Sequence, residues 1–264
     1  EGYTTWSIGG KSGGDEPKLA GAFFLSPPLP LMDHLYVVAE VRGDIRLVVL
    51  DAKSGKLQWQ QQLCAGDSQP ILDNVVRRLG SATPSYSEGV LVCPTSAGAV
   101  VAVDVAKRSL LWGYQYLNAP QNQGNQGGFF RVTRRSTTKQ PGEAWADSSV
   151  TILGDRVFIT PVEHDEIVCL DLLNGTLKDE QDGKDKPLWR RPRDDGLYVG
   201  CVHGENVIIV GKDKLVAVNA DSGELAWEAL IPDAPQTMPS GRGFASDGKY
   251  FLPLTSSEVA TIDL

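Results

Sequence analysis

The segment LVVLDAKSGKLQWQQQL, residues 47–63, contains the pattern that decides the fold. Alternating apolar residues lead into Asp51, a turn follows at Ser54-Gly55, and a second strand-like run carries Trp59. An Asp at the start of a turn accepts backbone N–H bonds, and a Gly supplies the positive φ that such a turn requires. We therefore predict a β-hairpin whose returning strand presents a Trp.

The strand that ends in Asp or Asn recurs along the chain at intervals of 44 to 67 residues, and the fifth and last copy ends in Asp263. The repeated pairs are Asp51 with Trp59, Asp104 with Trp112, Asp171 with Trp189, and Asn219 with Trp227. Two copies depart from the pattern, because Arg108-Ser109 replaces the turn glycine in the second and the insertion LKDEQDGKDKP delays the Trp in the third. A long-period repeat of this kind indicates one supersecondary unit used several times.

Two further strand-like runs precede each repeated pair, such as LYVVAEV and NVIIVG, and helix signals are scarce. Four short antiparallel strands per unit predict an all-β fold, a β-propeller that forms a single domain over residues 1–264. The predicted blades span about 20–63, 79–117, 145–192 and 197–231, with a composite blade from 240–264 plus 1–10. We expect each Trp to be largely buried against the neighbouring blade, with its indole N–H bonded, as a structural clamp without a catalytic role.

The two ends of the chain predict how the propeller closes. The segment VATIDL places Asp263 where the other copies have their Asp or Asn, and EGYTTW carries Trp6 as a fourth strand would. Pairing these ends would remove the exposed strand edges, so we expect a closed ring of five blades. The alternative is an arc of a larger propeller with seven or eight blades.

The order of apolar strand, Asp, Ser-Gly or Asn-Gly, and Trp resembles the repeat of the PQQ-like β-propellers, a family that includes quinoprotein dehydrogenases and BamB-type proteins. The resemblance implies a periplasmic or extracellular protein of the bacterial cell envelope. Because the repeat accounts for most of the distinctive residues, we expect a non-catalytic scaffold that binds other proteins. The alternatives are a propeller that binds a ligand or glycan, and a PQQ-dependent quinoprotein dehydrogenase.

A quinoprotein enzyme needs PQQ, a calcium ion held by side-chain oxygens, a general base and an aromatic residue stacked on the cofactor. In the dehydrogenases that the chain resembles, a ring formed by adjacent cysteines covers the cofactor, whereas Cys64, Cys93, Cys169 and Cys201 are widely separated here. We therefore expect no cofactor and no catalytic residues. The cluster VEHDE, residues 162–166, suits a polar hairpin tip better than a metal site.

Composition excludes several other classes of protein. A net charge of -8 argues against a nucleic-acid partner, which requires a concentrated basic face. No apolar run approaches the roughly 18 to 20 residues of a membrane span. The cysteines form no CxxC pair, which argues against a structural zinc site, and we expect Cys93 and Cys169 to be buried free thiols.

One long segment, residues 116–145, is not explained by the repeat. It is rich in Gln, Asn and Gly, and its centre combines two aromatic residues with three arginines, which are residue types enriched at binding hot spots. The candidate binding surface consists of Phe129, Phe130, Arg131, Arg134 and Arg135, together with Arg77 and Arg242 from equivalent blade connections. A surface of this composition suits a protein partner or an anionic glycan. The alternative is a mobile loop whose phenylalanines cover a blade face.

Overall fold

The computed structural model describes residues 2–66, 71–74, 77–78, 80–117, 143–179, 181 and 183–264. Their regular structure is almost entirely β-strand, with short 3-10 helices η1 (Pro17–Leu19) and η2 (Ile71–Asp73). Among these residues, no helix has the length and apolar character needed to cross a membrane.

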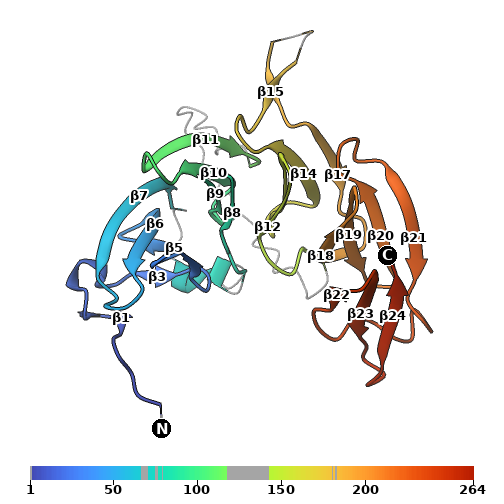
Figure 1. Cartoon of the computed structure of the whole chain (residues 1–264), viewed down its shortest axis with the longest axis horizontal. Coiled ribbons are helices and arrows are strands. Elements are labelled where there is room, and N and C mark those ends of the chain that lie inside the picture. Colours follow the sequence, from blue (N-terminus) through green and yellow to red (C-terminus); the bar gives the residue numbers. More distant parts are fainter. Residues whose placement is uncertain are drawn as a thin grey trace, which may run out of the picture.

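Five antiparallel sheets follow one another along the chain (Figure 1). The first contains β3 (Phe23–Phe24), β4 (Leu29–Leu31), β5 (His34–Val41), β6 (Asp44–Asp51) and β7 (Leu57–Ala65). The second contains β8 (Ser85–Ser87), β9 (Val90–Pro94), β10 (Ala99–Asp104) and β11 (Ser109–Gln115). The third contains β12 (Ser149–Leu153), β13 (Arg156–Thr160), β14 (Glu166–Asp171) and β17 (Trp189–Pro192).

The fourth sheet contains β18 (Gly196–His203), β19 (Asn206–Gly211), β20 (Lys214–Asn219) and β21 (Leu225–Leu230). The last has three strands, β22 (Phe244–Ser246), β23 (Lys249–Pro253) and β24 (Val259–Asp263). Two short hairpins lie outside these sheets, β1 (Ile8–Gly9) with β2 (Gly13–Gly14), and β15 (Leu177–Lys178) with β16 (Asp185–Lys186). The second of these hairpins is the insertion in the third repeat, and it projects outward from its sheet (Figure 1).

The sheets are arranged side by side along an arc, in the order of the chain (Figure 1). Their first strands contact one another in series, β8 with β12, β12 with β18, and β18 with β22. Apolar side chains fill the space between successive sheets because alternate residues of a strand face opposite sides. Leu47 and Leu91 belong to one such cluster, and Ile208 and Tyr250 belong to another. This arrangement supports the predicted β-propeller repeat, and we call the sheets blades 1 to 5.

The turn that follows each third strand is built as the repeat predicts. Ser54 donates its backbone N–H to Asp51 Oδ1 at 2.7 Å, and the equivalent bond from Asn174 to Asp171 is 2.8 Å. Asn219 accepts in the same way from the backbone N–H of Ser222 at 3.0 Å. Hydrogen bonds from the side chain and backbone of Ser54 lower the pKa of the Asp51 carboxyl. The conformation of these turns therefore depends on hydrogen bonds between residues that are close together in the sequence.

In blades 2 and 3, the Trp of the fourth strand packs on the turn of the next blade. The ring of Trp112 lies over Gly175, and its indole N–H donates to Leu172 O at 2.9 Å. Trp189 repeats both contacts one blade later, over Gly223 and with Ala220 O at 2.9 Å. In these two pairs the tryptophan joins one blade to the turn of the next.

Trp59 and Trp227, the other two tryptophans of the repeat, make different contacts. Where the second repeat lacks the turn glycine, Arg108 occupies the positive-φ position at +54°, and its guanidinium lies 5.8 Å from the centre of the Trp59 ring. A cation over an aromatic face is attractive, so this contact takes the place of the glycine packing. Trp227 packs against the apolar cluster between blades 4 and 5. All these rings are partly buried, with most of their surface covered by the neighbouring residues.

The predicted closure of the ring is not formed. Trp6 lies over Gly55 in blade 1, and residues 2–7 contain no strand. Within the described residues, β24 pairs with β23 alone, and the two ends of the arc lie apart (Figure 1). The physical reason is that the N-terminal segment is bound to blade 1, where Leu19 is buried against β5 and β6 and Glu16 accepts the backbone N–H of Leu57.

A buried ion pair joins blade 1 to the connection that leads into blade 2. Arg77 is only 3% exposed, and it donates to Glu40 Oε2 at 2.7 Å and to the backbone carbonyl of Ser96 at 2.7 Å. Glu40 belongs to blade 1 and its side chain is 11% exposed. Arg77 therefore holds the two blades together from inside. The prediction that it contributes to an exposed basic patch is wrong.

The contact between Trp and the turn glycine can be tested by adding one methyl group. A Cβ at residue 175 would lie 2.7 Å from Cδ2 of Trp112, whereas a Cβ at Gly183, which also has positive φ, would meet nothing within 4 Å. We expect G183A to cost about 1–2 kcal/mol from backbone strain, and G175A to cost about 1–3 kcal/mol more from overpacking. Chemical denaturation measures both, and equal costs would contradict the clamp.

The buried ion pair predicts a large difference between two neighbouring arginines. We expect R77A to lower the free energy of unfolding by about 3–5 kcal/mol, because it leaves the Glu40 carboxylate buried without its partner. Arg78 is exposed, so R78A is the matched control and should change the stability by about 0.5 kcal/mol or less. Urea denaturation of both variants gives the comparison, and a small effect of R77A would show that Glu40 reaches solvent.

Candidate functional site

The centre of the predicted binding surface lies outside the described residues. Phe129, Phe130, Arg131, Arg134 and Arg135 all fall between residues 118 and 142, which the structure does not describe. Their role remains a prediction. Of the other predicted members, Arg77 is internal and only Arg242 reaches solvent, with 48% of its side chain exposed.

Arg242 bridges elements that belong to different blades. Its guanidinium pairs with the Asp147 carboxylate, just before β12, and lies 4.6 Å from the centre of the Tyr198 ring in β18. The Tyr198 hydroxyl in turn donates to Gly241 O at 3.0 Å. These contacts orient Arg242, so its charge is partly satisfied within the protein.

The side chains of VEHDE point to separate partners and do not form one site. The Tyr116 hydroxyl donates to Glu163 Oε2 at 3.3 Å, and burial raises the pKa of the Glu163 carboxyl. Asp165 Oδ1 lies 3.4 Å from Arg193 Nε, and Glu166 lies 3.6 Å from the His164 ring. Across the described part of the chain, no three His, Cys, Asp or Glu side chains gather as a metal site would require.

Two cysteines behave as the sequence predicts. Cys93 and Cys169 are buried free thiols, and burial raises the pKa of Cys169 to about 12. Burial also raises the pKa of Cys93 well above its usual value. Because the thiolate is the reactive form, both groups are inert near neutral pH.

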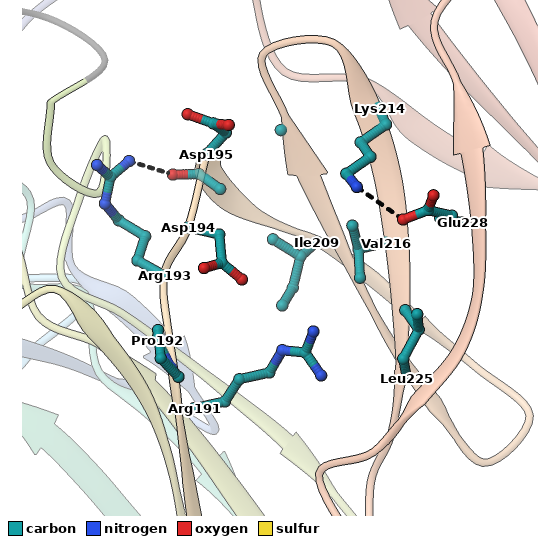
Figure 2. Close-up of a pocket in the computed structure, with 12 residues that line it drawn as sticks. Arg191, Pro192, Arg193, Asp194, Asp195, Ile209, Lys214, Val216, Leu225 and Glu228 are labelled. Atoms are coloured by element: carbon teal, nitrogen blue, oxygen red, sulfur yellow. Dashed lines mark hydrogen bonds and ion pairs between the residues drawn. The ribbon is translucent and has the colours of Figure 1, made fainter.

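A pocket opens between blades 3 and 4, where β17 leaves the third blade (Figure 2). Its volume is about 150 Å³, and its floor consists of the aliphatic side chains of Ile209, Val216 and Leu225. Ile209 and Val216 are neighbours in register, so they present one face of blade 4. Arg191 reaches into the space from β17 (Figure 2), and one of its N–H groups lies 3.4 Å from Gly223 O. The pocket therefore combines an apolar floor with a guanidinium.

Other charged groups surround this floor. Lys214 and Glu228 pair across the rim at 2.7 Å, and the pairing with Glu228 raises the pKa of Lys214. Arg193 donates to Gly196 O at 2.7 Å and lies beside Asp165, so it is directed away from the opening. Asp194 points its carboxylate into the same space as Arg191 (Figure 2). Chemically, the pocket suits a small apolar group that carries or neighbours a charge.

The sequence contains a signal for this pocket at positions outside the Asp, Gly and Trp pattern. Side chains two and four positions after each Trp share its face of the strand and point toward the next blade. These positions hold Gln61 and Leu63, then Tyr114 and Tyr116, then Arg191 and Arg193, and finally Ala229 and Ile231. Only the third pair is charged, and that is where the pocket opens.

The comparisons with known proteins agree with the repeat. The family model for the outer membrane protein assembly factor BamB matches residues 17–140. No curated protein matches the chain in sequence.

Several solved structures resemble the chain in fold. The crystal structure of BamB from Moraxella catarrhalis is 13% identical with a TM-score of 0.57, and the match covers 90% of this chain and 58% of that one. A quinohemoprotein alcohol dehydrogenase from Pseudomonas putida is 11% identical with a TM-score of 0.52, covering 92% and 43%. Sqt1 of Saccharomyces cerevisiae is 11% identical with a TM-score of 0.51, covering 92% and 58%.

These similarities describe the fold, because all the identities are low, and the chain spans only part of each of these proteins. The Asp, Gly and Trp residues that carry the sequence resemblance are the ones that build the turns and the contacts between blades. Residues 17–140 thus match the BamB family model, and the chain as a whole resembles BamB in fold, as its sequence predicted.

Proposed function

We propose that this chain is a non-catalytic scaffold that binds another protein in the bacterial cell envelope, in a periplasmic or extracellular location. The observation that carries the proposal is that the residues shared by the repeats are used in contacts within and between blades. Asp51 and Asp171 cap turns, while Trp112 and Trp189 clamp neighbouring blades. A partner would therefore bind the residues in which the blades differ from one another.

The location and the class of partner rest on the family match. The model that matches residues 17–140 is described as an outer membrane protein assembly factor, which supports a role in the cell envelope. The fold by itself does not choose a function, since the similar structures include an alcohol dehydrogenase as well as BamB. The scaffold is favoured because it requires no group beyond those that the blades present.

The quinoprotein alternative would require PQQ with calcium, and the residues that the structure describes do not provide the usual ligands. Calcium takes six to eight oxygen ligands, with carboxylates prominent among them. Glu163, Asp165 and Glu166 each face a different partner. We propose that the chain acts without a cofactor.

Binding of a protein can be tested by photo-crosslinking in living bacteria that export the chain. A photoreactive residue at Asp194 lies on the face of the blade connections, whereas one at Lys107, which is 75% exposed, lies on the opposite face with the repeat turns. We expect one discrete crosslinked protein from position 194 and none from position 107, because the partner docks on the variable face. The measurement is a gel shift followed by mass spectrometry.

Two outcomes would contradict the scaffold. Absence of crosslinks from both positions, in cells where the exported chain is folded, would remove the evidence for a protein partner. Saturable binding of PQQ in the presence of calcium, measured by calorimetry on the purified chain, would instead support the quinoprotein alternative.

A further inference from the structure

The interface between blades 3 and 4 differs chemically from the other interfaces between blades. Two or four positions after the Trp, blade 1 presents Leu63 and blade 2 presents Tyr116, and both side chains pack into the apolar space before the next blade. Ile231 does the same for blade 4 and is 2% exposed. At the equivalent positions blade 3 has Arg191 and Arg193. With arginines in place of aliphatic or aromatic side chains, part of the apolar floor of blade 4 stays exposed at Leu225.

The two arginines differ in their partners. Arg193 lies beside Asp165 and donates to Gly196 O. In the part of the chain that the structure describes, Arg191 pairs with no carboxylate, and its hydrogen bond to Gly223 O is long at 3.4 Å. The carboxylate of Glu228 is occupied by Lys214 at 2.7 Å. Arg191 therefore directs unused donors over an apolar floor (Figure 2).

The size and lining of the pocket indicate what it accepts. A volume of about 150 Å³ accommodates a side chain rather than a drug-sized ligand. The floor of Ile209, Val216 and Leu225 suits an aliphatic group, and none of the described residues that line the pocket has an aromatic ring to stack on a sugar. A guanidinium recognises a carboxylate with two parallel hydrogen bonds.

We propose that this pocket binds a protein segment in which an aliphatic side chain stands next to a carboxylate side chain. The aliphatic group packs on Leu225 and Ile209, and the carboxylate pairs with Arg191. Asp194, which also points into the space, favours an N–H group or a basic side chain on the same segment (Figure 2). The proposal rests on the proposed scaffold function and assigns it a site and a class of partner.

The experiment uses capped hexapeptides of the form Gly-Ser-Leu-Glu-Ser-Gly, titrated into the purified chain. Labelled methyl groups of Ile209, Val216 and Leu225 report binding at the pocket by NMR. We expect these methyl signals to shift saturably with the Leu-Glu peptide. Peptides with Leu-Gln or Ser-Glu at the centre should bind about tenfold more weakly, because each lacks one of the two contacts.

Two arginine variants test whether Arg191 is the group that binds the carboxylate of the peptide. R191Q should weaken the Leu-Glu peptide about tenfold but leave the Leu-Gln peptide unchanged, because the lost bond is the one to the carboxylate. Arg190 lies on the same strand with its side chain on the opposite, exposed face, so R190Q is the matched control and should bind as the unchanged chain does. L225E, at a half-exposed floor position, should abolish binding of every peptide without affecting the melting temperature.

Several results would overturn the proposal. These are equal binding of the Leu-Glu and Leu-Gln peptides, equal binding by the unchanged chain and R191Q, or methyl shifts that respond to oligogalacturonate but to no peptide. The scaffold function fails separately, because its crosslinking test does not depend on Arg191. A partner crosslinked at position 194 equally well in the chain and in R191Q would keep the scaffold and reject this pocket.

Discussion

The packing of a tryptophan ring on the turn of the next blade is the interaction on which the rest of the structure depends. A ring such as Trp112 fits there because Gly175 has no side chain and because a positive φ turns the backbone toward it. The indole N–H is bonded to a carbonyl of the same turn, so the ring is oriented as well as buried. Each contact joins a fourth strand to the blade that follows, so the contacts link the blades in the order of the chain.

Once the blades are clamped in this way, the residues between the clamps are free to differ. Tyr116 and Ile231 complete apolar interfaces, whereas Arg77 joins its blades through an ion pair with Glu40. Between blades 3 and 4, Arg191 leaves an opening over an aliphatic floor. The function that we propose therefore resides in a departure from the repeat, and the repeat supplies the rigid frame that holds it.

The sequence predicted the features that depend on local chemistry. The bond from the turn to Asp51, the positive φ of Gly55 and a hydrogen-bonded indole N–H at Trp112 all follow from residues a few positions apart or one repeat apart. Closure of the ring was predicted wrongly. Trp6 packs on Gly55 in this open arc just as it would in a closed ring, so the Trp pattern in the sequence could not distinguish the two. Arg77 was misassigned because burial depends on Glu40, 37 residues away. The pocket was missed because Arg191 stands at a position that elsewhere only fills an interface.

Fluorine NMR of the chain labelled with 5-fluorotryptophan tests the account most directly. The six tryptophans give six signals, which single Trp-to-Phe variants assign. Each glycine contact predicts one response, so G55A should move the signal of Trp6, G175A that of Trp112, and G223A that of Trp189, while the other signals stay in place. If G175A leaves the Trp112 signal unchanged, or if the glycine variants move the signals without this one-to-one correspondence, the clamp between successive blades is contradicted.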